Sequence, residues 1–327
     1  VGHRNVQQTK RHQALKGAAS IKRILCVILC LAALLPLSGC WSRIEPKYLG
    51  IVNSIIYDVD DEGNFIVHLE FLNAADVGGG EGGAKSKGSN FTIQARGGSP
   101  REAIANISQS VDRSIFGGHN KVRFFSEKLA KGDVTPTLDY ILRAKLTDET
   151  ALIGVIKGDK PEKIYEATLD ISDTVGNYIE NMSRFLPDSS SKAIFPTTLD
   201  FVRDYYNDGK QPVAAVVEIV ENKSLAPKGE DKGGGESGDE GKKEYKIICE
   251  GLAAFKDGVL VGYFNGEETR AYNFIVNEVH NIHITVPTET GKTVFGISNS
   301  NCKIKTSKDG DKIKIDIKVK VNSSIAA

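Results

Sequence analysis

Residues Gly251–Phe274 read GLAAFKDGVLVGYFNGEETRAYNF, and this stretch decides the fold class because strand, turn and helix signals follow one another directly. Lys246–Phe255 and Val259–Phe264 are mostly apolar, and Asp257-Gly258 between them is a strong signal for a β-hairpin. Gly266–Asn273 then predicts a short helix. A hairpin that leads straight into a helix is typical of an α+β fold.

The rest of the second half is rich in predicted strands. Ile282–Val286 and Thr293–Ser298 are β-prone, and Cys302–Thr306 and Lys312–Val321 flank Asp309-Gly310 as a second hairpin. In the last of these strands, isoleucine and valine alternate with lysine and aspartate. One face of that strand is therefore apolar and needs a covering partner.

The first half mixes helix and strand signals. Ser99-Pro100-Arg101-Glu102 is a helix start, with serine as the N-cap and proline at the first helical position, and the apolar spacing after it predicts a helix reaching Gly117. Further helices are predicted at 135–146, 161–167, 174–182 and 198–206, and strands at 49–52, 55–59, 65–72, 91–95, 122–125, 152–156 and 213–220.

Two low-complexity segments interrupt these patterns. Residues 78–88 form a glycine-rich loop, and residues 227–243 are rich in glycine, lysine, glutamate and aspartate and cannot form a core. We interpret residues 227–243 as a flexible linker between an N-terminal α+β domain, 40–226, and a second, strand-rich domain, 244–327. The sequence thus predicts two mixed helix and sheet domains.

Residues 1–39 have the features of a pre-sequence that ends in a lipoprotein signal peptide. Lys22-Arg23 precede the apolar run Ile24–Leu35, about a dozen residues long, whereas a membrane-spanning helix needs about 20. Leu37-Ser38-Gly39-Cys40 follows and resembles a bacterial lipobox. That resemblance implies diacylglycerol on the Cys40 thiol, cleavage before Cys40 and an N-terminus acylated by a fatty acid such as palmitate. We expect this lipid to anchor the mature chain to a membrane outside the cytoplasm.

Removal of residues 1–39 changes the charge balance of the protein. The whole chain has 42 basic and 42 acidic residues, and the first 39 residues contain six basic and no acidic ones, which leaves 36 basic against 42 acidic. A slightly acidic chain without a cluster of lysine and arginine argues against nucleic-acid binding. With Cys40 lipidated, only Cys249 and Cys302 could pair, and a chain of this size does not need a disulfide.

The motifs expected of an enzyme are absent from the sequence after residue 39. His280 and His283 lie three apart on a predicted strand, so they point to opposite faces, and no Gly-x-Ser-x-Gly, His-Glu-x-x-His or Cys-x-x-Cys occurs. Glu267-Glu268 begin a predicted helix, where carboxylates favour the positive end of the helix dipole. We interpret this pair as structural or partner-contacting, and we expect no enzymatic activity, no metal and no cofactor besides the lipid on Cys40.

Three motifs occur in order along the chain: Gly39-Cys40-Trp41-Ser42-Arg43, Phe116-Gly117-Gly118-His119 and Gly251–Arg270. Together they resemble the Ger(x)C family, the C-subunit lipoproteins of spore germinant receptors. Ser42 stands where that family usually has an acidic residue, and one glycine is extra in the second motif. The candidate structural or subunit-contact residues are Gly251, Phe255, Gly262, Gly266, Glu267, Glu268, Thr269 and Arg270.

The resemblance implies a function and a location. It implies a membrane-anchored, non-enzymatic subunit that triggers spore germination by assembling with integral membrane subunits into a nutrient germinant receptor. The expected location is the outer face of the inner spore membrane. Family members continue into a further α+β domain, so the resemblance also implies that this chain is truncated at its C-terminus, with the last domain incomplete or missing.

Two other functions stay open from the sequence alone. A solute-binding lipoprotein of a transporter would show two lobes of alternating βα units around a cleft, a pattern that the strand-rich second half does not fit. An envelope enzyme would use the carboxylates of Glu267 and Glu268, and loss of turnover on changing either residue would be needed to support it.

Overall fold

The structure, a computed structural model, describes residues 22, 25–29, 45–72, 91–144, 147–169, 171–221, 244–279, 281–289 and 291–325. The chain divides into two compact units, 1–48 and 49–327. In the first unit, residues 25–29 are helical and Pro46–Tyr48 form a 3₁₀ turn, η2. The lipidation site predicted at Cys40, the glycine-rich loop 78–88 and the predicted linker 227–243 lie outside the described residues.

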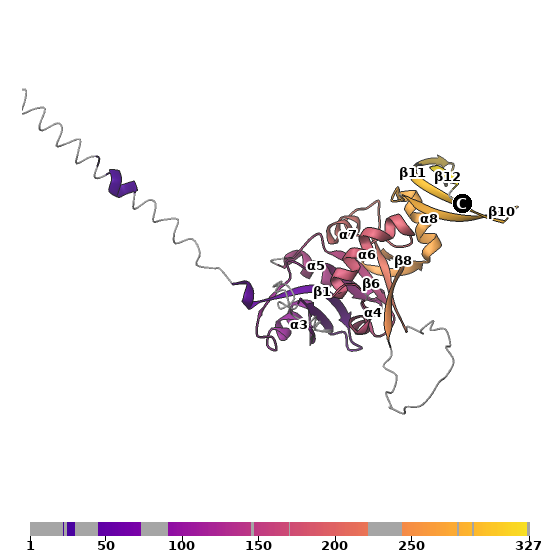
Figure 1. The fold of residues 1–327 in the computed structure, drawn as a ribbon. Helices are drawn as coiled ribbons and strands as arrows, with labels where there is room; N and C mark the ends of the chain where they lie inside the picture. Colours follow the sequence, from indigo (N-terminus) through magenta and orange to yellow (C-terminus); the bar gives the residue numbers. More distant parts are fainter. Residues whose placement is uncertain are drawn as a thin grey trace, which may run out of the picture. The chain divides into compact units, whose positions relative to one another are not determined.

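A nine-stranded mixed sheet is the centre of the second unit (Figure 1). Its strands are β1 (Leu49–Val59), β2 (Phe65–Phe71), β3 (Phe91–Gly97), β4 (Ser114–Phe116), β5 (Val122–Ser126), β6 (Leu152–Lys157), β7 (Val213–Glu221), β8 (Tyr245–Lys256) and β9 (Val259–Phe264). The strand order is β3-β2-β1-β5-β6-β7-β8-β9, and the short β4 pairs with the start of β1. β1, β5, β6 and β7 are parallel to one another, and antiparallel strands flank them on both sides.

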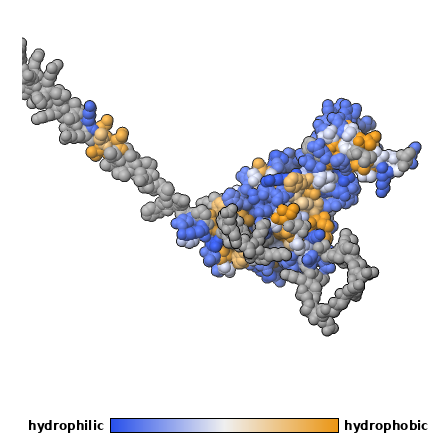
Figure 2. Space-filling view, in the orientation of Figure 1, coloured by the Kyte–Doolittle hydropathy of each residue, from blue (hydrophilic) through white to orange (hydrophobic). Residues whose placement is uncertain are grey.

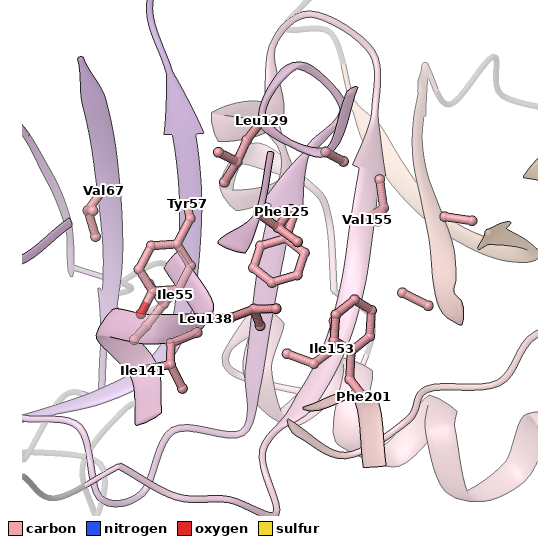
Figure 3. Close-up of a cluster of buried hydrophobic side chains, with 14 of the residues drawn as sticks. Ile55, Tyr57, Val67, Phe125, Leu129, Leu138, Ile141, Ile153, Val155 and Phe201 are labelled. Carbon is pink, nitrogen blue, oxygen red and sulfur yellow. The ribbon is translucent and has the colours of Figure 1, made fainter. Parts of the chain in front are cut away.

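Helices cover both faces of this sheet. Their bounds are α3 (Pro100–Ile107), α4 (Glu127–Lys131), α5 (Thr135–Arg143), the 3₁₀ helix η3 (Pro161–Glu166), α6 (Val175–Ser189) and α7 (Thr198–Tyr205). α3, α4, α5 and α7 pack on one face, and η3 and α6 pack on the other. Because side chains alternate along a strand, β1 directs Ile55 and Tyr57 to the first face and Ile56 to the second. Figure 3 shows the first core, where the rings of Phe125 and Phe201 meet edge to face with centroids 5.9 Å apart.

The start of α3 is as the sequence predicts, but its end is not. Ser99 caps the helix, because its Oγ accepts the N–H of Glu102 at 3.2 Å. The predicted extension to Gly117 is wrong, since α3 ends at Ile107 and the residues before Gly117 form β4. Residues 114–116 form a strand because they pair in parallel with the start of β1. β1 lies far away in the chain, so the spacing of apolar residues around residue 115 gives no sign of this pairing.

The predicted boundary between two domains falls inside the large sheet. β7 and β8 are antiparallel neighbours, with Val213 opposite Ala254, so residues 227–243 connect two paired strands. β8 and β9, which the sequence assigns to the second domain, complete the edge of the large sheet. The linker-like composition of residues 227–243 is compatible with a long connection between neighbouring strands, and composition does not reveal which strands pair.

A second, smaller sheet follows helix α8 (Gly266–Val276). It contains three antiparallel strands, β10 (Ile282–Thr288), β11 (Gly291–Asp309) and β12 (Lys312–Ile325). Val279, Ile282 and Ile297 form a small core there, and Phe274 of α8 packs against it. Mixed sheets and helices in this arrangement confirm the α+β fold.

The apolar face predicted for the last strand is present on β12. Among the described residues nothing buries it, and Ile313 is 75% exposed. Figure 2 shows hydrophobic residues among hydrophilic ones at the surface of this small sheet. An exposed edge strand with an apolar face is a template for pairing with another chain.

Candidate functional site

The candidate motif occupies the β8–β9 hairpin and helix α8. At the hairpin turn Asp257 and Gly258 both have positive φ, 51° and 83°, as in the type I′ turn that Asp-Gly predicts. Helix α8 then begins with a capping box: Asn265 Oδ1 accepts the N–H of Glu268 at 3.0 Å, and Glu268 Oε2 accepts the N–H of Asn265 at 2.8 Å. Glu268 therefore has a defined role in starting the helix.

Arg270 attaches α8 to the end of α6. Its Nε donates to the carbonyl oxygen of Ser190 at 3.1 Å, and its Nη1 lies 2.9 Å from Glu267 Oε2. Lys192 Nζ lies 3.4 Å from the other carboxylate oxygen of Glu267. The Arg270 side chain is 16% exposed and the Glu267 side chain is 68% exposed. Because exposed ion pairs contribute little to stability, the hydrogen bond from Arg270 to Ser190 stabilises the fold more than the contact with Glu267 does.

The buried face of α8 holds the segment that follows α6. Asn273 Nδ2 donates to the carbonyl oxygen of Ser191 at 2.7 Å and to its Oγ at 3.0 Å. Ser191 has φ of 54°, a left-handed conformation that is uncommon for residues other than glycine. Thr269, on the same helix, is fully buried. These contacts keep the end of α6 in one conformation.

The three candidate glycines of the motif differ in whether the structure leaves room for a side chain at their position. Gly251 on β8 has φ of 102°, and a Cβ there would lie 2.7 Å from the carbonyl oxygen of Phe264. Gly266 is buried at the start of α8, where a Cβ would meet the flexible side chain of Glu250. At Gly262 nothing lies within 4 Å of a Cβ. Gly251 is therefore the position where only glycine fits without strain.

Phe255 completes the motif by packing the hairpin against the body of the unit. Its side chain is 2% exposed, and its ring meets that of Phe201 on α7 edge to face with centroids 5.3 Å apart. The eight candidate residues thus lie along the β8–β9 hairpin and the first turns of α8. Of these eight, Glu267 and Glu268 are exposed to solvent.

The described residues include two free cysteines of the second unit and no metal-binding group. They contain no group of three His, Cys, Asp or Glu side chains that could hold a metal ion. Cys249 and Cys302 are free thiols, and burial raises the pKa of the Cys249 thiol to about 12, so this thiol stays protonated and unreactive at neutral pH. Within the same ranges, no helix is long and apolar enough to cross a membrane.

Two buried charged residues, Glu70 and Arg123, belong to no sequence motif. Glu70 on β2 accepts hydrogen bonds from Ser54 Oγ at 2.7 Å and from the N–H groups of Val175 and Gly176, at 2.8 and 3.1 Å, where α6 begins. Arg123 lies on β5 and is 1% exposed. A lone carboxylate or guanidinium inside a mostly apolar strand is the signal that could have identified them.

The chain matches two protein-family models. Residues 42–219 match the spore germination protein N-terminal domain, and residues 250–327 match the spore germination B3/GerAC-like C-terminal domain. The chain belongs to the Ger(x)C family. This is the C-subunit family of germinant receptors. The two Ger(x)C matches leave residues 220–249 between them, and that interval contains the connection from β7 to β8.

Ger(x)C relatives from Bacillus subtilis (strain 168) are similar over most of the chain. Spore germination protein KC is 24% identical over 284 residues, which cover 85% of this chain and 67% of that protein. Putative spore germination protein YfkR is 25% identical over 305 residues, which cover 92% of this chain and 73% of that protein. The crystal structure of the GerBC protein matches with 15% identity and a TM-score of 0.39, over 83% of this chain and 71% of that one. The family resemblance drawn from the motifs is thus confirmed.

Proposed function

We propose that this chain is a membrane-anchored, non-enzymatic subunit of a nutrient germinant receptor that triggers spore germination by assembling with integral membrane subunits. The match of two Ger(x)C family models over residues 42–219 and 250–327 carries this proposal. The lipobox ending at Cys40 supports a lipid anchor on the outer face of the inner spore membrane. The structural roles of Glu268 and Arg270 in capping and attaching α8 support a role without catalysis.

Spores that carry Cys40→Ala are expected to lose most of the nutrient response that the wild-type gene restores, because an unlipidated chain lacks its attachment to the membrane. The measurement is the fall in optical density of deletion-strain spores after addition of amino acids and sugars. Immunoblots of the membrane fraction follow the protein in the same spores.

Cys302→Ala is the matched control for this experiment, since it removes a free thiol that lies outside the lipobox. This variant should restore the response fully and stay in the membrane fraction. A full response with the Cys40→Ala protein still in the membrane fraction would contradict the lipid anchor. A deletion that leaves every nutrient response intact would contradict the receptor function itself.

The exposed side of α8 is the surface that we propose for contact with the other receptor subunits. Glu267, Glu268 and Ala271 are exposed on this side. The rings of Phe264 and Tyr272 stack beside them with centroids 6.3 Å apart, and Phe264 is 38% exposed. Aromatic side chains next to polar groups are characteristic of protein interfaces.

Ala271→Arg should reduce recovery of the membrane subunits about tenfold when the protein is purified from spore membranes, because a long cation on α8 prevents close contact. Thermal unfolding should stay the same, since Ala271 is exposed. Asn181→Arg, which places the same side chain on an exposed position of α6, is the control. If both variants recover equal amounts of the membrane subunits, the contact does not involve α8.

A further inference from the structure

A partly open cavity of about 470 Å³ lies on the face of the large sheet that carries the core of Figure 3. Strands β1, β2 and β5 contribute to its wall, together with α3, residues 113–117 and the end of α5. Its volume lies within the range of roughly 300–1,000 Å³ that is common for small-molecule sites. The candidate motif around α8 contributes no residue to the described lining.

Arg123 is a buried cation in the wall of this cavity. Its Nη1 donates to the carbonyl oxygen of Asp148 at 2.8 Å and to Thr198 Oγ1 at 2.6 Å, while its buried Nε has no hydrogen-bond partner. None of the ion pairs found in the described ranges includes Arg123. The carboxylate of Asp148 attracts this guanidinium electrostatically but makes no ion pair with it. Burying a cation without a carboxylate in direct contact costs free energy, so this guanidinium favours an anion beside it.

Two tyrosines and a second arginine supply strong hydrogen-bond donors to the same wall. Tyr57 is almost fully buried beside Arg123, and burial raises the pKa of both Tyr57 and Tyr140, so both hydroxyls remain protonated donors at neutral pH. Arg113 is 41% exposed, and its ion pair with the exposed carboxylate of Asp112 is loose at 4.0 Å. The described lining thus presents two arginines and two tyrosine hydroxyls and contains no acidic residue.

The remaining lining has the hydroxyls of Ser108, Ser114 and Thr147, and its apolar part includes Ile104 of α3 and Ile115. Cationic donors suit an anionic group, and an apolar wall suits a hydrocarbon body. We infer that this cavity binds a small organic carboxylate with an apolar body, the carboxylate directed to Arg113 and Arg123 and the body to Ile104 and Ile115. Binding of such a ligand goes beyond the proposed receptor function and can be measured without it.

Calorimetric titration of the full chain, purified in detergent, with isocaproate tests this inference. We expect saturable binding of isocaproate at least about tenfold tighter than binding of isocaproamide, which has the same body without the charge. We also expect acetate and inorganic phosphate to bind at least about tenfold more weakly than isocaproate, because they lack the apolar body.

Three variants connect the binding to the cavity. Arg113→Gln should weaken isocaproate binding about tenfold, and Ile104→Trp, which fills the cavity, should abolish it. Arg184→Gln removes an exposed arginine of α6 and should leave the affinity unchanged. Thermal unfolding of each variant shows that it is folded, and Arg113 serves as the main probe because its side chain is 41% exposed.

Several outcomes would overturn the inference. These are equal affinities for isocaproate and isocaproamide, no saturable binding of isocaproate, or unchanged affinity in folded Arg113→Gln and Ile104→Trp proteins. Phosphate binding as tight as isocaproate binding would also overturn it, since the apolar wall would then have no role. Loss of the germination response without loss of isocaproate binding, or the reverse, would separate this site from the proposed receptor function.

Discussion

Gly251→Ala is expected to lower the free energy of unfolding by about 3 kcal/mol. Two residues of β8, Glu250 and Gly251, lie opposite the single residue Val216 of β7, and this arrangement is a β-bulge. In the bulge Gly251 has φ of 102°. An alanine Cβ would lie 2.7 Å from the backbone carbonyl oxygen of Phe264 on β9. Relief of that contact requires the pairing of β8 with β9 to shift. Urea unfolding followed by far-UV circular dichroism measures the loss.

Gly262→Ala is the matched control because Gly262 lies on the neighbouring strand β9. Its φ is not positive, and nothing lies within 4 Å of an added Cβ. Alanine there should keep the free energy of unfolding within about 0.5 kcal/mol of the wild-type value or raise it slightly. Equal losses at Gly251 and Gly262 would show that the bulge is not the cause.

Glu70→Ala is expected to lower the free energy of unfolding by about 3 kcal/mol at neutral pH. The variant would remove the buried carboxylate that accepts hydrogen bonds from Ser54 Oγ and from the N–H groups of Val175 and Gly176 at the start of α6. Glu218→Ala on β7 is the control, since this carboxylate is 41% exposed and pairs with a lysine at the surface. Its loss should cost less than about 1 kcal/mol. Similar losses in the two variants would contradict the role assigned to Glu70.

The pH dependence of stability gives a second measurement on Glu70. Burial raises the pKa of this carboxyl above its ordinary value of 4.5, against the opposing effect of its hydrogen-bond donors. The contribution of Glu70 to stability is then complete below pH 4.5, the ordinary pKa of a glutamate. It declines as the pH rises through the raised pKa of Glu70 in the folded state. Wild-type protein should therefore lose stability relative to non-titrating Glu70→Gln between acidic and neutral pH. A difference in urea midpoint that stays constant over this range would contradict the raised pKa.

Features that depend on neighbours in the chain could be predicted from the sequence. The Asp257-Gly258 turn, the Ser99 cap and the helix after Gly266 each rest on a few adjacent residues with a specific backbone preference. The order of motifs also led to the correct family. The end of α3 and the membership of β8 and β9 in the large sheet could not be predicted, because both depend on pairing with distant strands.

The candidate residues divide in the same way. The sequence by itself determined that Glu267, Glu268 and Arg270 share one helix, since Gly266–Asn273 predicts a helix that begins with the two carboxylates. Only the tertiary structure decided that Arg270 reaches Ser190 while Glu267 stays exposed. Likewise, the cavity beside Arg123 exists because β1, α3 and α5 come together in space. Contacts between segments far apart in the chain leave no local pattern in the sequence, so only the tertiary structure reveals them.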